Sequence, residues 1–276
     1  MRTLAARFAG YAILVFFSLV FLYPFVIQIA NSFKTEADAA ANPLSPLADP
    51  FTTESMTRIF DGTGFPTWLS NSLLVTVIVT ITRVLLNSMA GYALSRLRFP
   101  GRRPIFATII ALMAVPGVVL LIPKFLVLNQ LGIYDTYAAL IVPLIADAAG
   151  VFIMKQFFDS IPVSIEEAAR IDGASIFRTF WSVVLPTARP ALITLTILSF
   201  QGSWNEFGHT LVAVQNPSLF TLPRGLADLV SGSLGSGTQY PLKLGAALLA
   251  TIPVAIIFVI FQRYFVRDAN QGAEKG

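Results

Sequence analysis

Long apolar runs constrain the fold of this chain more than any other feature. Six of them occupy residues 8–30, 69–94, 105–128, 138–158, 191–214 and 242–262. A helix of about 20 apolar residues crosses the roughly 30 Å hydrocarbon core of a bilayer. Because lipid cannot hydrogen-bond to the backbone, an open chain crosses it as helices. The runs therefore predict an all-α, polytopic membrane protein with six transmembrane helices.

Composition agrees with this prediction and argues against several classes of function. Hydrophobic residues make up 55% of the chain and charged residues 12%, and the mean hydropathy is +0.72, which is too apolar for a soluble domain. The chain has no cysteine, which excludes disulfides and thiolate metal sites, and its one histidine, His209, argues against a transition-metal site. The basic residues stand beside apolar runs, which argues against a nucleic-acid surface.

The sequence shows no sign of catalysis or of nucleotide binding. It contains no GxxxxGK[ST] phosphate-binding loop, and no Ser/His/Asp set or pair of carboxylates suggests an active site. We therefore expect no catalytic residue, no metal and no cofactor bound by this chain.

Lysine and arginine placement predicts the orientation. The N-terminus, residues 95–104, residues 155–189 and the C-terminus are rich in Lys and Arg, whereas the opposite loops hold more Asp and Glu. By the positive-inside rule, both termini are then cytoplasmic. A cleaved signal peptide is an alternative for the first run, since ADAAA follows it. That run is longer than the roughly 7–15 residues of a signal core, which favours a retained span.

A charged insert, residues 159–190, lies between two of the apolar runs. Ser164 and Glu167 have the spacing of a capping box, which predicts the start of a helix. Gly173 is placed to end that helix in the left-handed conformation. A second, amphipathic helix should follow and end at Pro186. A solvated surface loop is the alternative interpretation of such a stretch.

The same insert resembles the EAA signature of membrane subunits of ATP-binding-cassette (ABC) importers. Its EAA triplet at 167–169 is followed after three residues by Gly173, and after nine more by Val183, where the pattern usually has isoleucine. In that family this segment is the coupling helix, which docks into a groove on a cytoplasmic ATPase. The resemblance implies ATPase-coupling roles for Glu166, Glu167, Ala168, Ala169, Arg170, Asp172, Gly173, Leu185 and Pro186.

Other segments extend the resemblance over nearly the whole chain. GYALSRLRFPGRR after the second run, SWNEF in the fifth and QRYFV near the end are similar to the carbohydrate-uptake branch of these permeases, specifically its maltose-type second subunit. The terminal GAEKG resembles an ending that reaches between paired ATPases, which implies ATPase contacts for Lys275 and Gly276. RDANQ replaces the glycine-rich stretch that usually precedes it.

The family implies a fold, a location and partners. The fold would be the MetI-like permease fold of type I ABC importers, in the bacterial cytoplasmic (inner) membrane. The partners would be a second permease subunit, two cytoplasmic ATPases that bind ATP and Mg²⁺, and an extracytoplasmic solute-binding protein. The expected organisation is a first span within 1–30, an extracytoplasmic loop at 31–68, a permease core at 69–262 that contains the coupling loop 159–190, and a cytoplasmic tail at 263–276.

Polar residues inside the apolar runs are candidates for the solute path, because burying them in hydrocarbon is costly unless they face a partner or water. Asn71 could cap the second span or touch solute. In the fifth run, an indole beside amides and a carboxylate suits a sugar; interhelical contact, with Trp204 as core packing, is the alternative. The candidates are Asn71, Gln201, Trp204, Asn205 and Glu206.

Arg83 and Asp147 fall near the middles of the second and fourth runs. We expect them to pair with each other, since an isolated buried charge is much less stable than a hydrogen-bonded pair. The alternative is that Asp147 contacts a charged or amino-bearing solute. In maltose-type relatives, the loop that corresponds to residues 215–241 reaches toward the solute-binding protein; SGSLGSGTQY within it also has the composition of a plain linker.

These features predict the permease subunit of an ATP-driven ABC importer for a carbohydrate or sugar derivative, in which ATPase closure drives alternating access through the EAA coupling helix. The chain itself would not be an enzyme. An ion-coupled secondary transporter that uses Arg83, Asp147 and Glu206 is an alternative, although the matching broken helices of such carriers are not evident here. A non-transporting scaffold or intramembrane enzyme is a third possibility.

Overall fold

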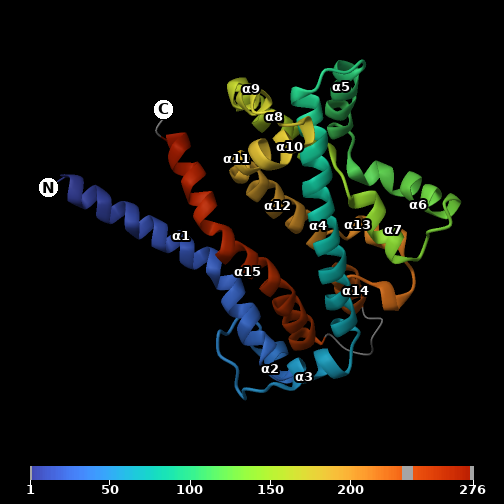
Figure 1. Ribbon diagram of the computed structural model, residues 1–276. Helices are drawn as coiled ribbons and strands as arrows, with labels where there is room; N and C mark the ends of the chain where they lie inside the picture. Colours follow the sequence, from blue (N-terminus) through green and yellow to red (C-terminus); the bar gives the residue numbers. More distant parts are fainter. Residues whose placement is uncertain (1, 232–238, 274–276) are drawn as a thin grey trace. The chain divides into compact units, whose positions relative to one another are not determined.

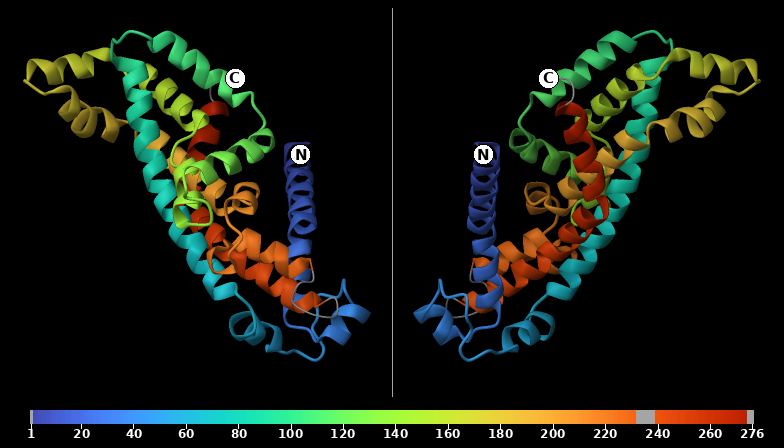
Figure 2. Two further views of the ribbon diagram at one scale, coloured as in Figure 1. Left: turned by 90° about the vertical axis from the view of Figure 1, so that its right-hand side faces the viewer. Right: turned by 90° about the vertical axis from the view of Figure 1, so that its left-hand side faces the viewer.

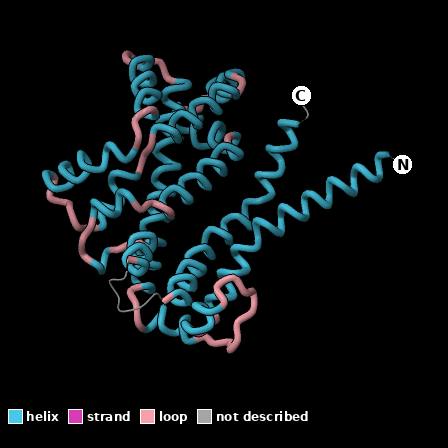
Figure 3. The backbone as a smooth tube through the Cα atoms, turned by 180° about the vertical axis from the view of Figure 1, so that it is seen from behind, coloured by secondary structure: helices cyan, strands magenta, loops and turns pink. Residues whose placement is uncertain are grey.

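The structure is a computed structural model, and it describes residues 2–231 and 239–273. These residues form helices joined by turns and loops, and they contain no strand (Figure 3). The all-α prediction is confirmed. The chain divides into two compact units, which we describe separately: unit 1 comprises Met1–Pro66 and Gly225–Pro253, and unit 2 comprises Thr67–Arg224 and Val254–Gly276.

Unit 1 is built from the N-terminal helix and short helices around it. It contains α1 (Arg2–Ser32), α2 (Glu36–Ala41), α3 (Glu54–Asp61), most of α14 (Leu222–Val230) and the first part of α15 (Tyr240–Ala273). Gly245 lets α15 approach α3 closely, because a Cβ there would lie 3.0 Å from the side chains of Met56 and Ile59. The chain after α1 is held by Lys34, which is fully buried and whose Nζ donates to Asn42 O at 2.7 Å and Ser45 O at 2.9 Å.

Unit 2 holds the remaining helices, of which Figure 1 labels the α-helices. They are α4 (Phe65–Arg96), α5 (Arg102–Met113), η1 (Gly117–Leu120), α6 (Leu121–Gln130), α7 (Tyr137–Ile141), η2 (Val142–Leu144), α8 (Ala148–Ser160), α9 (Val163–Ile171), α10 (Ile176–Thr179), the π-helix η3 (Phe180–Val184), α11 (Leu185–Thr187), α12 (Arg189–Trp204), α13 (Gly208–Ala213) and η4 (Pro217–Leu219).

Within residues 2–231 and 239–273, four helical stretches are long and apolar enough to cross a membrane: Phe8–Ser32, Phe65–Arg96, Tyr137–Ser160 and Tyr240–Gln262. Two further stretches qualify as bent pairs. Arg102–Met113 and Gly117–Gln130 meet at 102°, and Ile176–Thr187 and Arg189–Trp204 meet at 82°. The structure therefore has up to six candidate spans, if each bent pair counts as one.

The fifth predicted run has different bounds in the structure, and two segments predicted as loops contain short helices. The fifth run, 191–214, is interrupted, because α12 ends at Trp204 and a separate α13 begins at Gly208. The loops predicted at 31–68 and 215–241 contain α2, α3, η4 and α14. Helices α3 and α14 are short and amphipathic, and each buries only a few apolar residues, such as Ile59 or Leu222 and Leu229. Their amphipathic pattern extends over only 8 and 9 residues, which is shorter than the window in which helical periodicity is recognised.

The core of unit 2 lies where α4, α8, η3 and α12 meet. Its buried residues are Tyr92, Met154, Phe158, Ile161, Phe180, Val184, Ala188, Ala191 and Leu195. Helices α4 and α8 pack closely at two glycines. A Cβ at Gly91 would lie 2.8 Å from Met154 Cβ, and a Cβ at Gly150 would lie 2.0 Å from Asn87 Nδ2. Small residues allow such close approach of helices in membranes.

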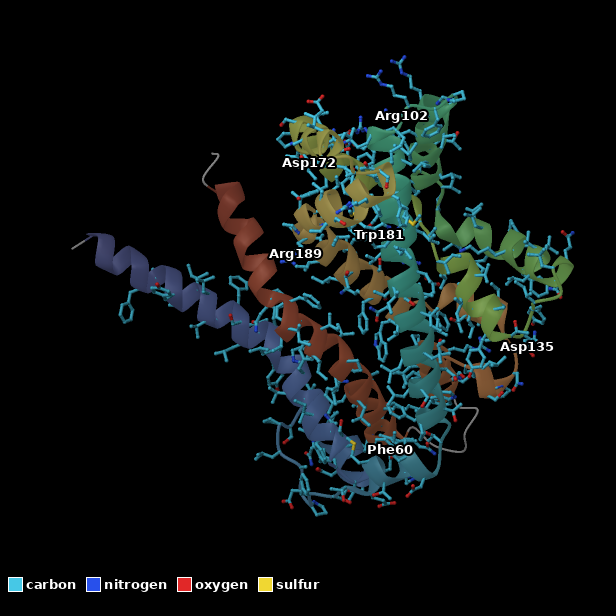
Figure 4. The ribbon with its side chains drawn as sticks, in the orientation of Figure 1. Phe60, Arg102, Asp135, Asp172, Trp181 and Arg189 are labelled. Carbon is cyan, nitrogen blue, oxygen red and sulfur yellow. The ribbon has the colours of Figure 1, made fainter. Side chains whose placement is uncertain are left out.

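Helices α9 and α10 project at the same end of α4 as the loop that leads to α5 (Figures 1 and 2). Arg102, the first residue of α5, and Asp172, the residue after α9, both lie at this end (Figure 4). The insert that the sequence analysis singled out therefore stands beside the basic loop between the second and third apolar runs.

Candidate functional site

Helix α9 carries the EAA triplet and begins two residues earlier than a capping box at Ser164 requires. Its N-cap is Pro162, and no side chain caps it, so the predicted capping box is wrong. Ser164 already has helical backbone, and its hydroxyl cannot therefore serve as the N-cap acceptor. The position of Gly173 is confirmed, since its φ is +78° and Ala174 N donates to Ala169 O at 2.9 Å, as in a Schellman turn.

The second helix of the insert starts as predicted and ends differently. Ser175 caps α10 by accepting a hydrogen bond from the N–H of Arg178. Pro186 does not end a helix but lies in the first turn of α11, directly after the π-helix η3. A proline in a first turn is tolerated, because an N–H there has no intrahelical partner to lose. The chain bends instead at Ala188, between α11 and α12.

Glu166 anchors α9 to the end of α4. Its side chain is 1% exposed, and Oε1 lies 2.8 Å from Arg96 Nε. The hydroxyl of Tyr92 donates to Oε2 at 3.1 Å, and Arg170 Nη2 lies 3.9 Å from the same oxygen. A carboxylate this deeply buried is stable only when charged and neutral donors surround it, as here. We call Arg96, Glu166 and Tyr92 the α4–α9 clamp.

Arg96 also binds the end of α8. Its Nη2 donates to the carbonyl oxygens of Phe158 and Ile161, which are among the last acceptors of that helix and of the turn after it. Nearby, Ser95 Oγ donates to Asp159 Oδ1 at 2.6 Å. One side chain of α4 therefore fixes the C-terminal end of α8 and the position of α9 together.

The other residues predicted for ATPase coupling lie mostly on the surface. Glu167, Ala168, Arg170, Asp172 and Gly173 are exposed, Ala169 is half-buried and Pro186 is exposed. Leu185 packs against the core of unit 2. Glu166 alone of this set is buried, so its carboxylate faces inward onto Arg96 and holds the helix in place.

The opposite face of α9 is bare. Ser164, Ala168 and Ile171 recur at i, i+4 and i+7, which places them on one side of the helix, about opposite Glu166. All three are exposed, and Ile171 reaches 86%. This face, which we call the outer face of α9, offers small and apolar contacts.

Arg83 and Asp147 are brought together in the middle of unit 2. Arg83 Nε lies 3.1 Å from Asp147 Oδ2 and donates to Leu144 O at 2.9 Å. Asp147 is the N-cap of α8, since its Oδ1 accepts from Gly150 N at 2.6 Å. Asn87 donates to Asp147 Oδ2 at 3.2 Å and accepts from Asp147 N at 3.3 Å.

This arrangement explains why charges occur within two apolar runs. The fourth run is broken between η2 and α8, so the backbone groups at the break lack helical partners. Arg83 satisfies the carbonyl before the break, Asp147 satisfies an N–H after it, and Asn87 satisfies the N–H at it. Polar backbone at membrane depth is tolerated only when it is satisfied in this way. We call Arg83, Asn87 and Asp147 the central clamp.

Asn71 occupies a different place from the one predicted. Helix α4 begins at Phe65, so Asn71 lies inside the helix and is not its cap. The side chain is buried, and Nδ2 donates to Ser218 O and Phe220 O, both at 2.9 Å. Oδ1 accepts from the hydroxyl of Tyr137 at 2.7 Å. The amide thus joins three segments of unit 2 and has its polar atoms engaged within the chain.

The polar residues near the end of α12 do not form one binding surface. Trp204 is 3% exposed and stacks on Phe200, with ring centroids 5.8 Å apart, which favours the core-packing alternative. Glu206 Oε1 accepts from His209 N at 2.8 Å at the start of α13. Gln201 and Asn205 are exposed, and Asn205 Nδ2 donates to Gln201 O at 3.0 Å.

Two sequence predictions fall outside the described residues. Lys275 and Gly276 belong to the tail that the structure does not describe, and so does most of the SGSLGSGTQY segment. Within the described residues, no group of three or more His, Cys, Asp or Glu side chains could hold a metal ion.

Sequence reasoning missed the α4–α9 clamp and Asn87. Arg96 was counted only as a topology signal, although Tyr92 and Arg96 at i and i+4 share one face of α4. That spacing could have marked a polar stripe at the end of an apolar helix. The partner, Glu166, lies too far along the chain for any local pattern to show.

The sequence also matches a known protein family. Residues 84–271 match the family of binding-protein-dependent transport system inner membrane components. The chain belongs to this family. The match covers the α4–α9 clamp, the whole insert and the central clamp except Arg83, and it agrees with the MetI-like permease fold that the EAA resemblance implied.

Relatives cover nearly the full length of the chain. The arabinooligosaccharides transport system permease protein AraQ of Halalkalibacterium halodurans is 32% identical over 95% of this chain and 94% of its own. The inner membrane ABC transporter permease protein YcjP of Escherichia coli is 33% identical over 100% of this chain and 98% of its own. A chain in the crystal structure of a bacterial ABC transporter involved in the import of the acidic polysaccharide alginate is similar with a TM-score of 0.81. It shares 27% identity and covers 95% of this chain and 96% of its own.

Proposed function

We propose that this chain is one permease subunit of an ATP-driven ABC importer that takes up a carbohydrate or a sugar derivative. Relatives named for arabinooligosaccharides, diacetylchitobiose and trehalose/maltose support the solute class. The complete complex would contain a second permease, two cytoplasmic ATPases that bind ATP and Mg²⁺, and an extracytoplasmic solute-binding protein. Both termini and the insert would face the cytoplasm, as the Lys and Arg placement predicts.

The α4–α9 clamp is the observation that carries this proposal. A coupling helix must move with the spans, and a loosely attached loop could not transmit force. Here the ion pair between Arg96 and Glu166, at 2.8 Å and with both side chains at most 9% exposed, ties α9 to α4. Displacement of α9 by the ATPase would therefore displace α4 and the end of α8 as well.

The outer face of α9 would be the part that enters the ATPase groove. Its three residues are exposed, and the central one, Ala168, is small enough for a partner backbone to approach closely. Ile171 provides the apolar anchor that protein interfaces commonly have near their centre. ATP binding and hydrolysis belong to the partner, and the permease responds mechanically.

An ion-coupled mechanism receives less support. A relay needs carboxylates that can bind and release a proton or an ion. Asp147 and Glu206 both accept hydrogen bonds from backbone N–H groups at helix starts, and Asp147 also pairs with Arg83. These contacts assign structural roles to the carboxylates.

Reconstituted uptake tests the proposal directly. The full chain is purified with its partner subunits and placed in proteoliposomes, with sugars chosen by a binding screen on the solute-binding protein. We expect uptake to require internal ATP and to persist when ionophores collapse the ion gradients. Uptake that survives without ATP and stops with ionophores would refute the proposal.

The variant Ile171→Asp tests the outer face. A charge at this exposed apolar position should weaken ATPase binding at least about tenfold, measured by co-purification, without unfolding the permease. Leu131→Asp is the matched control, because Leu131 is 64% exposed and lies outside the insert. Equal loss of ATPase binding in both variants would contradict the assignment of this face.

A further inference from the structure

A cavity of 840 Å³ lies between the coupling segment and the basic loop that precedes α5. Its walls come from the end of α4, the 97–102 loop, one side of α9 and the 174–176 turn. The lining residues of α9 are Val163, Glu166, Glu167 and Arg170, which share a side of the helix distinct from the outer face. The cavity therefore does not include the outer face of α9, although Glu166, Glu167 and Arg170 belong to the residues that the family resemblance links to ATPase coupling.

The cavity carries an excess of positive charge. It is lined by four arginines, Arg96, Arg98, Arg102 and Arg170, and by two carboxylates, Glu166 and Glu167. Glu166 is taken up by Arg96, with Arg170 at 3.9 Å. In the part of the chain that the structure describes, no carboxylate lies within ion-pair distance of Arg98 or Arg102.

The guanidinium of Arg102 is held in position by carbonyl groups, and the Asp159 carboxylate interacts with its charge from beyond ion-pair distance. Its Nη1 donates to Leu97 O at 3.2 Å and its Nη2 to Ser95 O at 2.9 Å, so only neutral carbonyl groups hold it. Arg98 is exposed on the same loop. Two arginines that face one cavity without a carboxylate at ion-pair distance, one of them fixed by the backbone, suit an anionic group with several acceptor oxygens.

Apolar surface adjoins this charge. Phe99, between the two arginines, is 37% exposed, and Ile105, one turn into α5, is 46% exposed. The loop follows one candidate span and precedes another, so it lies at a membrane surface. Basic pockets between spans at the cytoplasmic surface are typical sites for anionic lipid head groups.

We propose that this cavity binds a phosphate-bearing anion, in the form of an anionic phospholipid head group, between the α4–α5 loop and α9. Arg98 and Arg102 contact the phosphate oxygens, and Arg170 contributes from α9. Because the ligand touches both the loop and the coupling segment, its occupancy stabilises one position of α9. The link to coupling rests on the proposed function, whereas binding itself does not.

Lipid binding to the intact complex tests the proposal. The full chain with its partner subunits is purified in detergent, and retained lipid is counted by native mass spectrometry after titration with phosphatidylglycerol or phosphatidylcholine. We expect phosphatidylglycerol to be retained preferentially. Arg98→Gln should weaken its retention about fivefold, the effect of one basic residue near an anionic surface. Arg103→Gln is the matched control, because Arg103 is exposed in the first turn of α5, close in sequence to Arg98, and does not line the cavity.

The other outcomes discriminate between sources and alternatives. Binding of inorganic phosphate is also measured in phosphatidylcholine nanodiscs, which contain no anionic lipid. Phosphate binding there that is abolished by Arg98→Gln would keep the anion site, but it would identify a free phosphate compound as the ligand in place of a lipid. An equal loss of phosphatidylglycerol retention in the Arg98 and Arg103 variants would show that the lipid is attracted to the basic surface as a whole, and it would overturn the site. Loss of ATPase co-purification in Arg98→Gln, with lipid retention unchanged, would also overturn it, by showing that the partner covers the cavity. A failure of ATP-driven uptake would leave these binding measurements unaffected.

Discussion

The α4–α9 clamp and the central clamp both attach a helix end to α4, but they do so in different surroundings. In each, an arginine of α4 donates to a carbonyl where another helix stops and pairs with a carboxylate of the helix that follows. The surroundings differ. Glu166 is 1% exposed, whereas the side chain of Asp147 is 34% exposed. The first pair is almost completely buried, at the edge of the cavity that its two side chains line, whereas the carboxylate of the second pair is partly exposed to water, so their loss should have unequal consequences.

Arg96→Gln should have the largest effect, because it leaves the Glu166 carboxylate buried without its partner. Removing one member of a buried ion pair lowers the free energy of unfolding by about 3–5 kcal/mol. Denaturant unfolding of the full chain in detergent measures the change, with Arg103→Gln as an exposed arginine control. Glu166→Gln in the same chain should restore part of the loss. A wild-type unfolding curve for Arg96→Gln would break the distinction between the two clamps.

Arg83→Ala should have a smaller effect, since Asp147 can still reach solvent and keeps its bonds to Asn87 and Gly150. A hydrogen bond to a charged group contributes about 1.5–3 kcal/mol, which is the loss we expect. The second variant is Asp147→Asn, which retains the N-cap oxygen. The double variant should lose less unfolding free energy than the sum of the losses in the two single variants. Strict additivity in this double-mutant cycle, measured by the same unfolding assay, would show that the two side chains do not act together.

Gly150→Ala should disturb the central clamp alone. Its Cβ would lie 2.0 Å from Asn87 Nδ2 and 3.0 Å from Leu195 Cδ1, so Asn87 must give up its contacts with Asp147. We expect a loss of about 1–3 kcal/mol, typical of overpacking. Gly117→Ala is the matched control, because nothing lies within 4 Å of a Cβ there. Hydrogen exchange should quicken at the start of α8 and stay unchanged in α9; an equal change in both would indicate that the clamps are not separate.

The fold could be predicted from the sequence because its causes are local. Apolar runs long enough to cross a bilayer predict spans, and Gly173 needed only the absence of a Cβ to predict the turn after α9. The Arg83–Asp147 contact could be anticipated because two lone charges in apolar runs must find partners. Each inference rests on a residue whose own chemistry restricts its surroundings.

The features that could not be predicted from the sequence depend on contacts between segments that are distant along the chain. Glu166 looked like its neighbour Glu167, and only the approach of α4 shows which of the two turns inward. Trp204 could have faced a sugar or a core until Phe200 and the fold around it were placed. Asn71 has three hydrogen-bond partners on the 218–220 segment and Tyr137, none of which is near it in sequence. Patterns in sequence do not report which face of a helix is covered.

Arg83 and Arg96, the arginines of the two clamps, both belong to α4, which is one uninterrupted helix. This continuity affects how the molecule can deform. Residues 83 and 96 are separated by about 20 Å of continuous α-helix. Such a strut resists compression, so a push delivered at its end reaches the break in the neighbouring span almost undiminished. The fourth span is interrupted between η2 and α8, so it is the part of unit 2 that can bend when α4 moves.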